Sequence, residues 1–271
     1  MKIAGSICVV TGAASGIGRA LVRALADAGA KRVVAVDLDE KGATAVAAGV
    51  GGIGLRADVS READVSGVVE RVERDLGPID LFCSNAGILV GGGPECADAE
   101  WQKIWEVNVM AHVWAARALV PRMIARGGGA LLQTASAAGL LSQIGSAPYA
   151  VTKHAAVALA EWLSITYGGQ GLQVAVLCPQ AVRTRMTDGI EDGGVAGVDG
   201  MIEPEDVAAA AIAGLEEGRF LILPHPTVAE YVRRKAEDHD RWIRGMRRLQ
   251  DRFGATGGMP AAGAPSRGSQ S

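Results

Sequence analysis

The alternation of short apolar segments with longer helical segments constrains the fold of this chain more than any other feature. The apolar segments are rich in β-branched residues and apolar on both faces, as buried strands are. They lie at 7–10, 33–36, 53–55, 81–83, 130–134, 174–178 and 220–223, and helical patterns fill 17–28, 40–48, 61–75, 99–125, 148–167 and 204–217. Such alternation is typical of a parallel sheet between two layers of helices. We therefore predict an α/β fold with a doubly wound parallel sheet of about seven strands in a three-layer α/β/α arrangement.

No internal repeat or linker divides the 271 residues, a length that suits one domain of this type. We predict a main domain over 1–225, an amphipathic helical extension over 226–253 and a flexible tail over 254–271. The segment 187–200 is rich in Gly and Asp, which predicts a loop or mobile lid.

The charge balance argues against a nucleic-acid-binding surface. Lys and Arg number 27 against 30 Asp and Glu, so a net charge of -3 provides no basic field. The longest uncharged stretch, 127–152, is long enough to span a bilayer. It contains Gln, Ser, Pro and five glycines, so we predict no membrane span.

The cysteines and the N-terminus favour a cytoplasmic location. The four cysteines form no CxxC pair and no metal-ligand spacing, so we expect no metal site. Cys8, Cys83 and Cys178 fall in predicted strands, where a thiol behaves as a small hydrophobic group. The first apolar run is too short for a signal peptide.

A glycine-rich turn follows the first predicted strand and opens a helix. It reads TGAASGIG over 11–18, with the spacing GxxxGxG. Glycines let a backbone turn sharply and approach a pyrophosphate, whose charge a helix N-terminus then stabilises. Asp37 ends the second predicted strand, where a carboxylate can bind both hydroxyls of an adenosine ribose. The two features predict a dinucleotide site, although a structural turn and a surface Asp remain alternatives.

Together with features further along, the chain resembles the short-chain dehydrogenase/reductase (SDR) family in its single-domain form, over about residues 5–225. The resemblance rests on seven features in the family's order: the turn at 11–18, Asp58 and Val59 after the third strand, Asn85-Ala86-Gly87 after the fourth, Asn108 in the long helix, Ser136 after the fifth strand, Tyr149-x-x-x-Lys153, and Pro179 with Thr184 after the sixth. It implies a Rossmann-type fold in which 1–225 is the catalytic and NAD-binding domain.

The resemblance also implies where the cofactor NAD is bound. Asp58 would bind the adenine edge, and Thr184, with Val182 beside it, would hold the nicotinamide amide. Asn85 is expected beside the cofactor, with a role as a strand-end cap left open. The predicted cofactor-binding residues are Gly12, Ser15, Gly16, Ile17, Gly18, Asp37, Leu38, Asp58, Val59, Asn85, Ala86, Gly87, Tyr149, Lys153, Pro179, Val182 and Thr184. Asp37 further predicts a preference for NAD over NADP, because a 2′-phosphate would place negative charge beside its carboxylate.

Tyr149, Lys153 and Ser136 are the predicted acid–base group. Hydride transfer to or from a carbonyl needs a proton partner for the oxygen, and a free Tyr is a poor base near neutrality. Tyr149 and Lys153 are four residues apart and share one helix face, so the cation is expected to lower the pKa of the phenol. Ser136 would hold the substrate oxygen against the tyrosine.

Asn108 completes the predicted catalytic set. It lies on the apolar face of its helix, where a buried Asn must find hydrogen-bond partners. The resemblance implies that it helps to hold a water linked to the lysine as a proton relay. No catalytic or metal-binding role is expected of His112, His154, His225 or His239.

Two segments depart from the family pattern. Gln180 follows Pro179 where most relatives have Gly, which either places a polar side chain near the pocket or leaves it facing solvent. The segment 227–253 combines an apolar stripe with eight Lys or Arg residues. We expect it to pack against a neighbouring subunit, with a membrane surface or nucleic acid as alternatives, and the resemblance implies a homodimer or homotetramer.

The predicted function is that of an NAD-dependent oxidoreductase interconverting a secondary alcohol and a ketone. The expected pocket walls suggest a hydrophobic or aromatic substrate, with Gln143 and Gln180 as polar anchors; these walls are Ile88, Leu89, Ala137, Leu140, Ile144 and Met186. One alternative is a non-catalytic dinucleotide-sensing or scaffold protein, which would be expected to lack the catalytic residues. Another is an NAD-dependent epimerase or dehydratase, whose glycine spacing and longer substrate domain are missing here.

Overall fold

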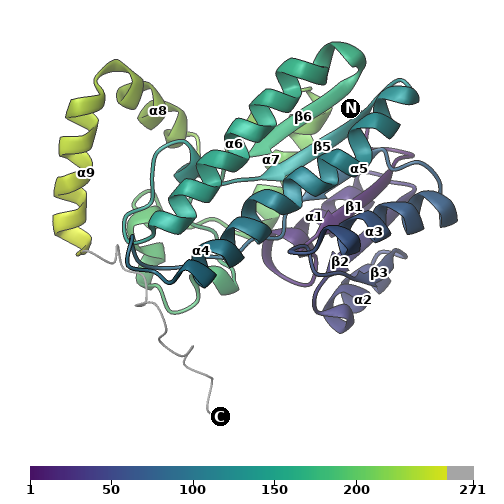
Figure 1. The fold of residues 1–271 in the computed structure, drawn as a ribbon, viewed down its shortest axis with the longest axis horizontal. Helices are drawn as coiled ribbons and strands as arrows, with labels where there is room; N and C mark the ends of the chain where they lie inside the picture. The colour runs from purple at the N-terminus through teal and green to yellow at the C-terminus, as the bar shows by residue number, and fades with distance from the viewer. Residues whose placement is uncertain (255–271) are drawn as a thin grey trace.

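The structure is a computed structural model and describes residues 1–254, apart from the side chain of Glu191. Seven strands, all parallel, form one sheet in the order β3-β2-β1-β4-β5-β6-β7 (Figure 1). They are β1 (Ile7–Thr11), β2 (Arg32–Asp37), β3 (Ile53–Arg56), β4 (Leu81–Ser84), β5 (Gly129–Thr134), β6 (Leu172–Leu177) and β7 (Leu221–Ile222). The predicted doubly wound, Rossmann-type parallel sheet is confirmed.

Helices α3, α5 and α6 cover one face of this sheet, and α1, α2 and α7 cover the other. The α-helices of the described residues are α1 (Gly16–Asp27), α2 (Glu40–Ala48), α3 (Glu62–Asp75), α4 (Asp98–Trp105), α5 (Ala111–Ala125), α6 (Ala147–Tyr167), α7 (Pro204–Glu216), α8 (Thr227–Glu237) and α9 (His239–Phe253). None of the helices within residues 1–254 is long and apolar enough to cross a membrane.

Alternation of side chains along the strands divides the core into two halves. Val9 of β1 packs into the core shared with α3, α5 and α6, whereas Cys8 and Val10 pack into the core shared with α1, α2 and α7. Successive strand residues point to opposite faces, so a strand covered on both sides is apolar throughout. This is why the sequence shows unbroken apolar runs.

The strand order reverses between β1 and β4, which are neighbours although they are not consecutive in the chain. Ligands of open α/β sheets bind outside the carboxyl ends of the strands at such a switch point. The segments that follow β1 to β6 at this edge carry most of the predicted site residues, and η1 (Glu106–Met110) and α6 carry the others, Asn108, Tyr149 and Lys153.

The predicted helix 99–125 is three segments. A π-helix, η1 (Glu106–Met110), separates α4 from α5, and the Ala111 amide donates to the Glu106 carbonyl five residues earlier. The π-turn contains Asn108, whose side chain is fully buried and bonded to the Ile88 backbone. π-turns inside helices are frequently found at functional sites.

The predicted C-terminal extension is two helices rather than one. Asp238 has extended backbone angles, ends α8 and accepts a hydrogen bond at 2.8 Å from the Arg241 amide as the N-cap of α9. An Asp that caps a helix in this way interrupts the preceding one. Both helices lie at one end of the molecule, with α9 apart from the sheet (Figure 1).

The segment 187–200 contains short 3₁₀ turns, η5 (Glu191–Gly197), which non-helical backbone angles at Asp192, Gly193 and Gly194 interrupt, so the segment is irregular. Of the predicted flexible tail 254–271, all but Gly254 lies outside the described residues.

Candidate active site

The glycine turn connects β1 to α1 as predicted, and its backbone leaves no room for a side chain at Gly18. A Cβ atom at that position would stand 2.0 Å from the carbonyl oxygen of Gly12. Ser15 is the N-cap of α1, and Gly16 and Ile17 form its first turn. Within the described residues the Ser15 side chain does not cap the helix. The turn therefore presents backbone amides and a helix N-terminus, which fits the pyrophosphate of a dinucleotide.

Asp37 lies beside this turn at the end of β2. Its carboxylate accepts hydrogen bonds at 3.0 Å from the amides of Ala14 and Asp39. Leu38, the next residue, is 57% exposed. The amides fix the orientation of the carboxylate while its remaining lone pairs can bind hydroxyl groups, so the position fits a ribose.

Asp58 and Val59 follow β3. Asp58 Oδ1 accepts hydrogen bonds from the hydroxyl of Ser60 at 2.7 Å and from its amide at 3.0 Å. These bonds lower the pKa of Asp58, chiefly through the Ser60 hydroxyl, so the carboxylate is charged at neutral pH. The side chain of Val59 packs against the sheet core.

Asn85 links the ends of β1, β4 and β5. Its amide nitrogen Nδ2 donates to the Thr11 carbonyl at 3.0 Å, and Oδ1 accepts from Thr134 Oγ1 at 3.1 Å. The Thr134 carbonyl in turn accepts a hydrogen bond at 3.0 Å from Lys153 Nζ. Asn85 thus ties strand ends together, the alternative role left open by the sequence, and the same network orients Lys153.

Ser136, Tyr149 and Lys153 meet where β5 ends and α6 begins. Ser136 follows β5, and its hydroxyl donates to the Pro179 carbonyl at 3.3 Å and accepts from the Ala138 amide at 3.1 Å. Lys153 Nζ lies 5.6 Å from the centroid of the Tyr149 ring. The Ser136 hydroxyl lies close enough to the Tyr149 phenol to lower its pKa. The three side chains form one buried group.

Burial dominates the titration of this group. It raises the pKa of Tyr149, although the nearby Ser136 hydroxyl acts in the opposite direction. Burial also lowers the pKa of Lys153 to about 8. The net direction for Tyr149 is set by removal of the phenol from water, which disfavours its charged form, and the expected lowering of this pKa by Lys153 stays a prediction.

Asn108 is held rigidly close to Lys153. Its Oδ1 accepts from the Ile88 amide at 2.9 Å, and its Nδ2 donates to the Ile88 carbonyl at 2.9 Å and to Thr152 Oγ1 at 3.2 Å. A Cβ atom on Gly87 would lie 3.3 Å from Lys153 Nζ and 3.4 Å from Asn108 Oδ1, so both groups face the same backbone position. Asn108 thereby joins the loop after β4 to α6.

The loop after β6 approaches the glycine turn. The methyl group of Thr184 lies 3.0 Å from where a Cβ on Gly16 would stand. Val182 forms a parallel bridge with Ile202, which fixes this loop beside the segment before α7. Pro179, Val182 and Thr184 are thus brought to the same sheet edge as Gly16 and Ser136, but Asp58 lies after the outer strand β3.

Gln180 connects the loop after β6 to the C-terminal helices. Its amide donates to His225 Nδ1 at 3.1 Å, and its side-chain Nε2 donates to Asp199 at 3.1 Å. Asp199 also accepts from Thr227 Oγ1 at 3.1 Å and from the Tyr231 hydroxyl at 2.9 Å. Nothing local in the sequence marks Asp199, since this cluster is formed by tertiary contacts.

His112, for which no catalytic or metal-binding role was expected, is buried. It lies one turn after Asn108, is 1% exposed, and neither ring nitrogen has a partner among the described residues. Burial, reinforced by the charge of Lys153, lowers the pKa of His112 to about 3. The sequence indicated this burial only by placing His112 four residues after Asn108, on the same apolar face of the predicted helix.

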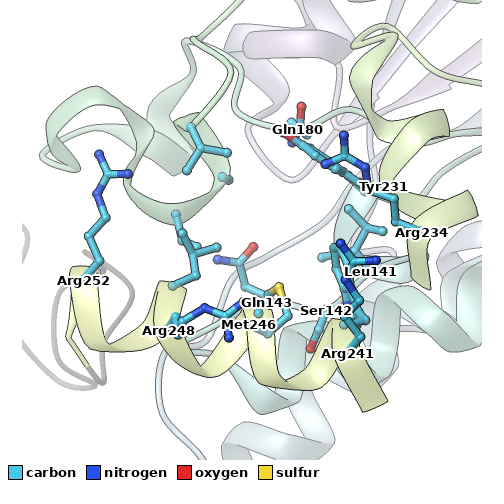
Figure 2. Close-up of a pocket in the computed structure, with 18 of the residues that line it drawn as sticks. Leu141, Ser142, Gln143, Gln180, Tyr231, Arg234, Arg241, Met246, Arg248 and Arg252 are labelled. Atoms are coloured by element: carbon cyan, nitrogen blue, oxygen red, sulfur yellow. The ribbon is translucent and has the colours of Figure 1, made fainter. Parts of the chain in front are cut away.

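A cavity of about 750 Å³ opens beside Ser136 and reaches the C-terminal helices (Figure 2). Of the predicted pocket residues, Ala137, Gln143 and Gln180 line it. Ile88 and Leu89 instead pack against Tyr149 and Ile104, and the other predicted walls, Leu140, Ile144 and Met186, are not part of this lining. The sequence missed the contribution of α8 and α9, because their placement over the loops is set by contacts distant in the chain.

Comparison with known proteins agrees with this geometry. The family model described as short chain dehydrogenase matches residues 6–193. The 1-deoxy-11-beta-hydroxypentalenate dehydrogenase of Streptomyces exfoliatus is 37% identical over 246 residues, which cover 88% of this chain and 90% of that protein. The 3beta-hydroxysteroid dehydrogenase 2 of Eggerthella lenta is 32% identical over 227 residues, covering 77% of this chain and 87% of the other.

A solved structure shares the fold at similar identity. The short chain dehydrogenase/reductase from Burkholderia phymatum in complex with NAD superposes with a TM-score of 0.80 at 31% identity, covering 89% of this chain and 96% of that one. The sequence match and the sheet order thus point to the same family. The chain belongs to the short-chain dehydrogenase/reductase family and is an oxidoreductase of the kind that acts on CH–OH groups.

Proposed function

We propose that this protein is an NAD-dependent dehydrogenase/reductase that interconverts a secondary alcohol and a ketone. The observation that carries the proposal is the buried group of Ser136, Tyr149 and Lys153 beside a cavity at the carboxyl ends of the strands. Both relatives named above are dehydrogenases of hydroxylated compounds, 1-deoxy-11-beta-hydroxypentalenate and 3beta-hydroxysteroids, which supports a CH–OH substrate.

Tyr149 is the proposed proton partner of the substrate oxygen. Because burial raises its pKa, Tyr149 holds its proton at neutral pH and can donate it to a carbonyl oxygen that is being reduced. In the opposite direction the phenolate must form transiently, and the cation of Lys153 stabilises it. With a pKa of about 8, Lys153 is protonated at pH 7.

Ser136 and Asn108 are proposed to position the reacting groups. The Ser136 hydroxyl, which donates to the Pro179 carbonyl in the protein alone, can turn to hold the substrate oxygen beside the phenol. Asn108 fixes the loop at Ile88 next to Lys153, which supports a role in returning protons to Lys153 from solvent.

The residues that would hold NAD lie along the switch point. When bound, the nicotinamide accepts or supplies the hydride. The turn at Gly12, Ser15, Gly16, Ile17 and Gly18 suits the pyrophosphate, Asp37 and Leu38 the adenosine ribose, Asp58 and Val59 the adenine, and Asn85, Ala86 and Gly87 the passage of the cofactor toward Lys153. Thr184, Val182 and Pro179 are proposed to face the nicotinamide.

NAD is the proposed cofactor in preference to NADP. The carboxylate of Asp37 is held at the end of β2 by two backbone amides, and no Lys or Arg within residues 1–254 forms an ion pair with it. A 2′-phosphate would therefore meet an unneutralised negative charge. The Burkholderia phymatum structure, which contains NAD, lends support.

Assembly into a homodimer or homotetramer is also proposed. The face of α6 exposes Val151, Trp162 and Ile165, the last of them 82% exposed. Large apolar side chains gathered on one helix face are typical of an interface between subunits. This face supports self-association more directly than α9, whose apolar residues turn toward the cavity.

The Tyr149→Phe variant tests the proposed chemistry. The ring and its packing are retained and only the proton-carrying hydroxyl is lost, so turnover should fall by ~100- to 10,000-fold. NAD affinity, measured by fluorescence titration, should change little. The assay follows reduced nicotinamide across a panel of secondary alcohols, and a variant with near-normal kcat would refute the mechanism.

A further inference from the structure

The cavity beside Ser136 has an unusual opposite wall. Figure 2 shows α9 on one side of the cavity, with Arg248, Met246 and Arg252 on it, and Gln180 and Tyr231 on the other side. At about 750 Å³ it has the size of a pocket for a drug-sized ligand. A substrate whose carbinol lies at Ser136 would therefore extend toward α9.

The charged residues of this wall are mostly cationic. Arg241, Arg248 and Arg252 lie within about 40° of one another around the α9 axis, given 3.6 residues per turn. All three line the cavity, together with Arg234 of α8. The acidic lining residues are Glu237 and Asp238, and the carboxylate of Asp238 caps α9.

Two acids that contact α8, or belong to it, are engaged within the protein. Asp199 accepts hydrogen bonds from Gln180, Thr227 and Tyr231, and Glu230 pairs with Arg234. Within residues 1–254, Arg241, Arg248 and Arg252 form no ion pair with a carboxylate. Their guanidinium groups, which bind carboxylates and phosphates in a two-pronged geometry, remain for a ligand.

Apolar side chains line the cavity together with the arginines. They are Trp242, Met246 and Leu249 of α9, and Leu141 and Val198 from the loops of the main domain. The lining thus combines the hydroxyl group of Ser136 with apolar side chains and with guanidinium groups on α9. This combination matches a ligand with an apolar body, a carbinol and an anionic group.

We infer that the substrate is an amphipathic anion: an apolar secondary alcohol or ketone whose carboxylate is bound by the α9 arginines. The inference rests on the proposed function for the position of the carbinol. It adds the anionic group, which the sequence analysis, expecting a hydrophobic or aromatic substrate, did not anticipate. The arginines are specificity residues and take no part in the chemistry.

Two adjacent arginines provide a matched test. Arg248 lines the cavity, whereas Arg247 is exposed on α9 outside the lining, so Arg248→Gln and Arg247→Gln remove the same charge on different faces. The probes are lithocholate and its methyl ester, which share an apolar body with a secondary alcohol and differ in the anionic group. Binding is measured with NAD present in the Tyr149→Phe background by calorimetry, so that the result does not depend on turnover.

Lithocholate should bind at least about 10-fold more tightly than its ester, the effect of one charge-assisted contact. Arg248→Gln should remove most of that ratio and Arg247→Gln should leave it unchanged. Equal binding of acid and ester, failure of both to bind, or equal effects of the two substitutions would overturn the inference. A change in molecular mass caused by Arg248→Gln at an unchanged acid-to-ester ratio would assign the α9 face to another subunit and overturn it too.

A different result would refute the proposed function itself. Absence of NAD-dependent turnover of any alcohol by the protein with Tyr149 intact would refute the dehydrogenase chemistry, whatever the binding ratio. An active enzyme without preference for the acid would refute only the anionic substrate.

Discussion

At the scale of single residues, Asp37 illustrates how one carboxylate can select a cofactor. Its oxygens are held by the amides of Ala14 and Asp39, so they cannot turn away from an arriving 2′-phosphate without breaking two hydrogen bonds. The preference then arises from repulsion of NADP rather than from stronger binding of NAD.

The Asp37→Ala substitution should therefore shift the preference toward NADP. We expect the wild-type protein to prefer NAD by ~100-fold in kcat/KM, corresponding to ~3 kcal/mol. The substitution should reduce this ratio substantially, and Glu40→Ala, which removes an exposed acid at the start of α2, should not. Steady-state kinetics with NAD and with NADP measure this ratio of kcat/KM values. Equal use of both cofactors by the wild type would argue against the role assigned to Asp37.

His112 makes stability depend on pH. Its pKa is about 3 in the folded protein against 6.5 in the unfolded chain, so below pH 6.5 the unfolded state binds the additional proton. The contribution of the neutral His112 side chain to the free energy of unfolding is constant well above pH 6.5 and decreases as the pH falls toward 3.

Replacing His112 by Leu should remove this dependence. Between pH 6.5 and pH 5 the wild-type protein should lose about 2 kcal/mol more unfolding free energy than the His112→Leu variant. Urea unfolding at the two pH values measures the difference, with His239→Leu on exposed α9 as the control. If the wild type and the His112→Leu variant lose equal amounts of unfolding free energy, the imidazole is hydrated in the native state and the prediction is contradicted.

At the scale of elements, the sequence predicted strands and helices well because each buries an apolar face of regular period. The ends of the elements were less accurate where tertiary contacts decide them. The predicted strand 220–223 is only Leu221–Ile222, and the helix 99–125 contains the π-turn at Asn108. Helical periodicity cannot indicate an inserted residue whose side chain bonds to the distant Ile88 backbone.

The candidate active site also divides into residues that the local sequence indicates and residues that tertiary contacts bring together. Residues in local motifs, such as Tyr149 with Lys153, could be proposed from their spacing together with the order of the other family features along the chain. The cavity wall could not, since α8 is positioned by Lys235, whose Nζ donates to the Leu140 and Leu141 carbonyls at 2.7 and 3.0 Å across about a hundred residues of sequence.

Asp199 connects α8 to the loop after β6, and its removal should loosen the cavity wall. We expect Asp199→Ala to raise KM several-fold with little change in kcat, because it releases Gln180, Thr227 and Tyr231 but leaves Tyr149 in place. Hydrogen exchange of the α8 amides should accelerate. The control is Asp188→Ala, an exposed acid of the same loop region; unchanged exchange in α8 would contradict the connecting role.

At the scale of the whole molecule, the α6 face is the feature that bears on assembly. Ile165 and Trp162 leave apolar area in water that burial against a second chain would remove, at about 25 cal/mol per Å². Such an interface would lie on the back of the catalytic helix, since Tyr149 and Lys153 occupy the buried side of α6.

Ile165→Glu should lower the molecular mass in solution, because a charge buried in an apolar interface loses its hydration. Sedimentation velocity measures the mass. The control is Ile53→Glu, the same kind of substitution at an exposed position in the edge strand β3. A monomeric wild type, or equal masses for both variants, would exclude this face as the interface.

The position of α8 and α9 at the end of the chain has a consequence for evolution. Every residue proposed for hydride and proton transfer precedes residue 185, whereas the cavity wall that faces Ser136 comes mostly from residues after 226. Recombination near Pro226 could therefore exchange the substrate range of one enzyme for another without altering its chemistry. Chimaeras of this kind are a route to new dehydrogenases.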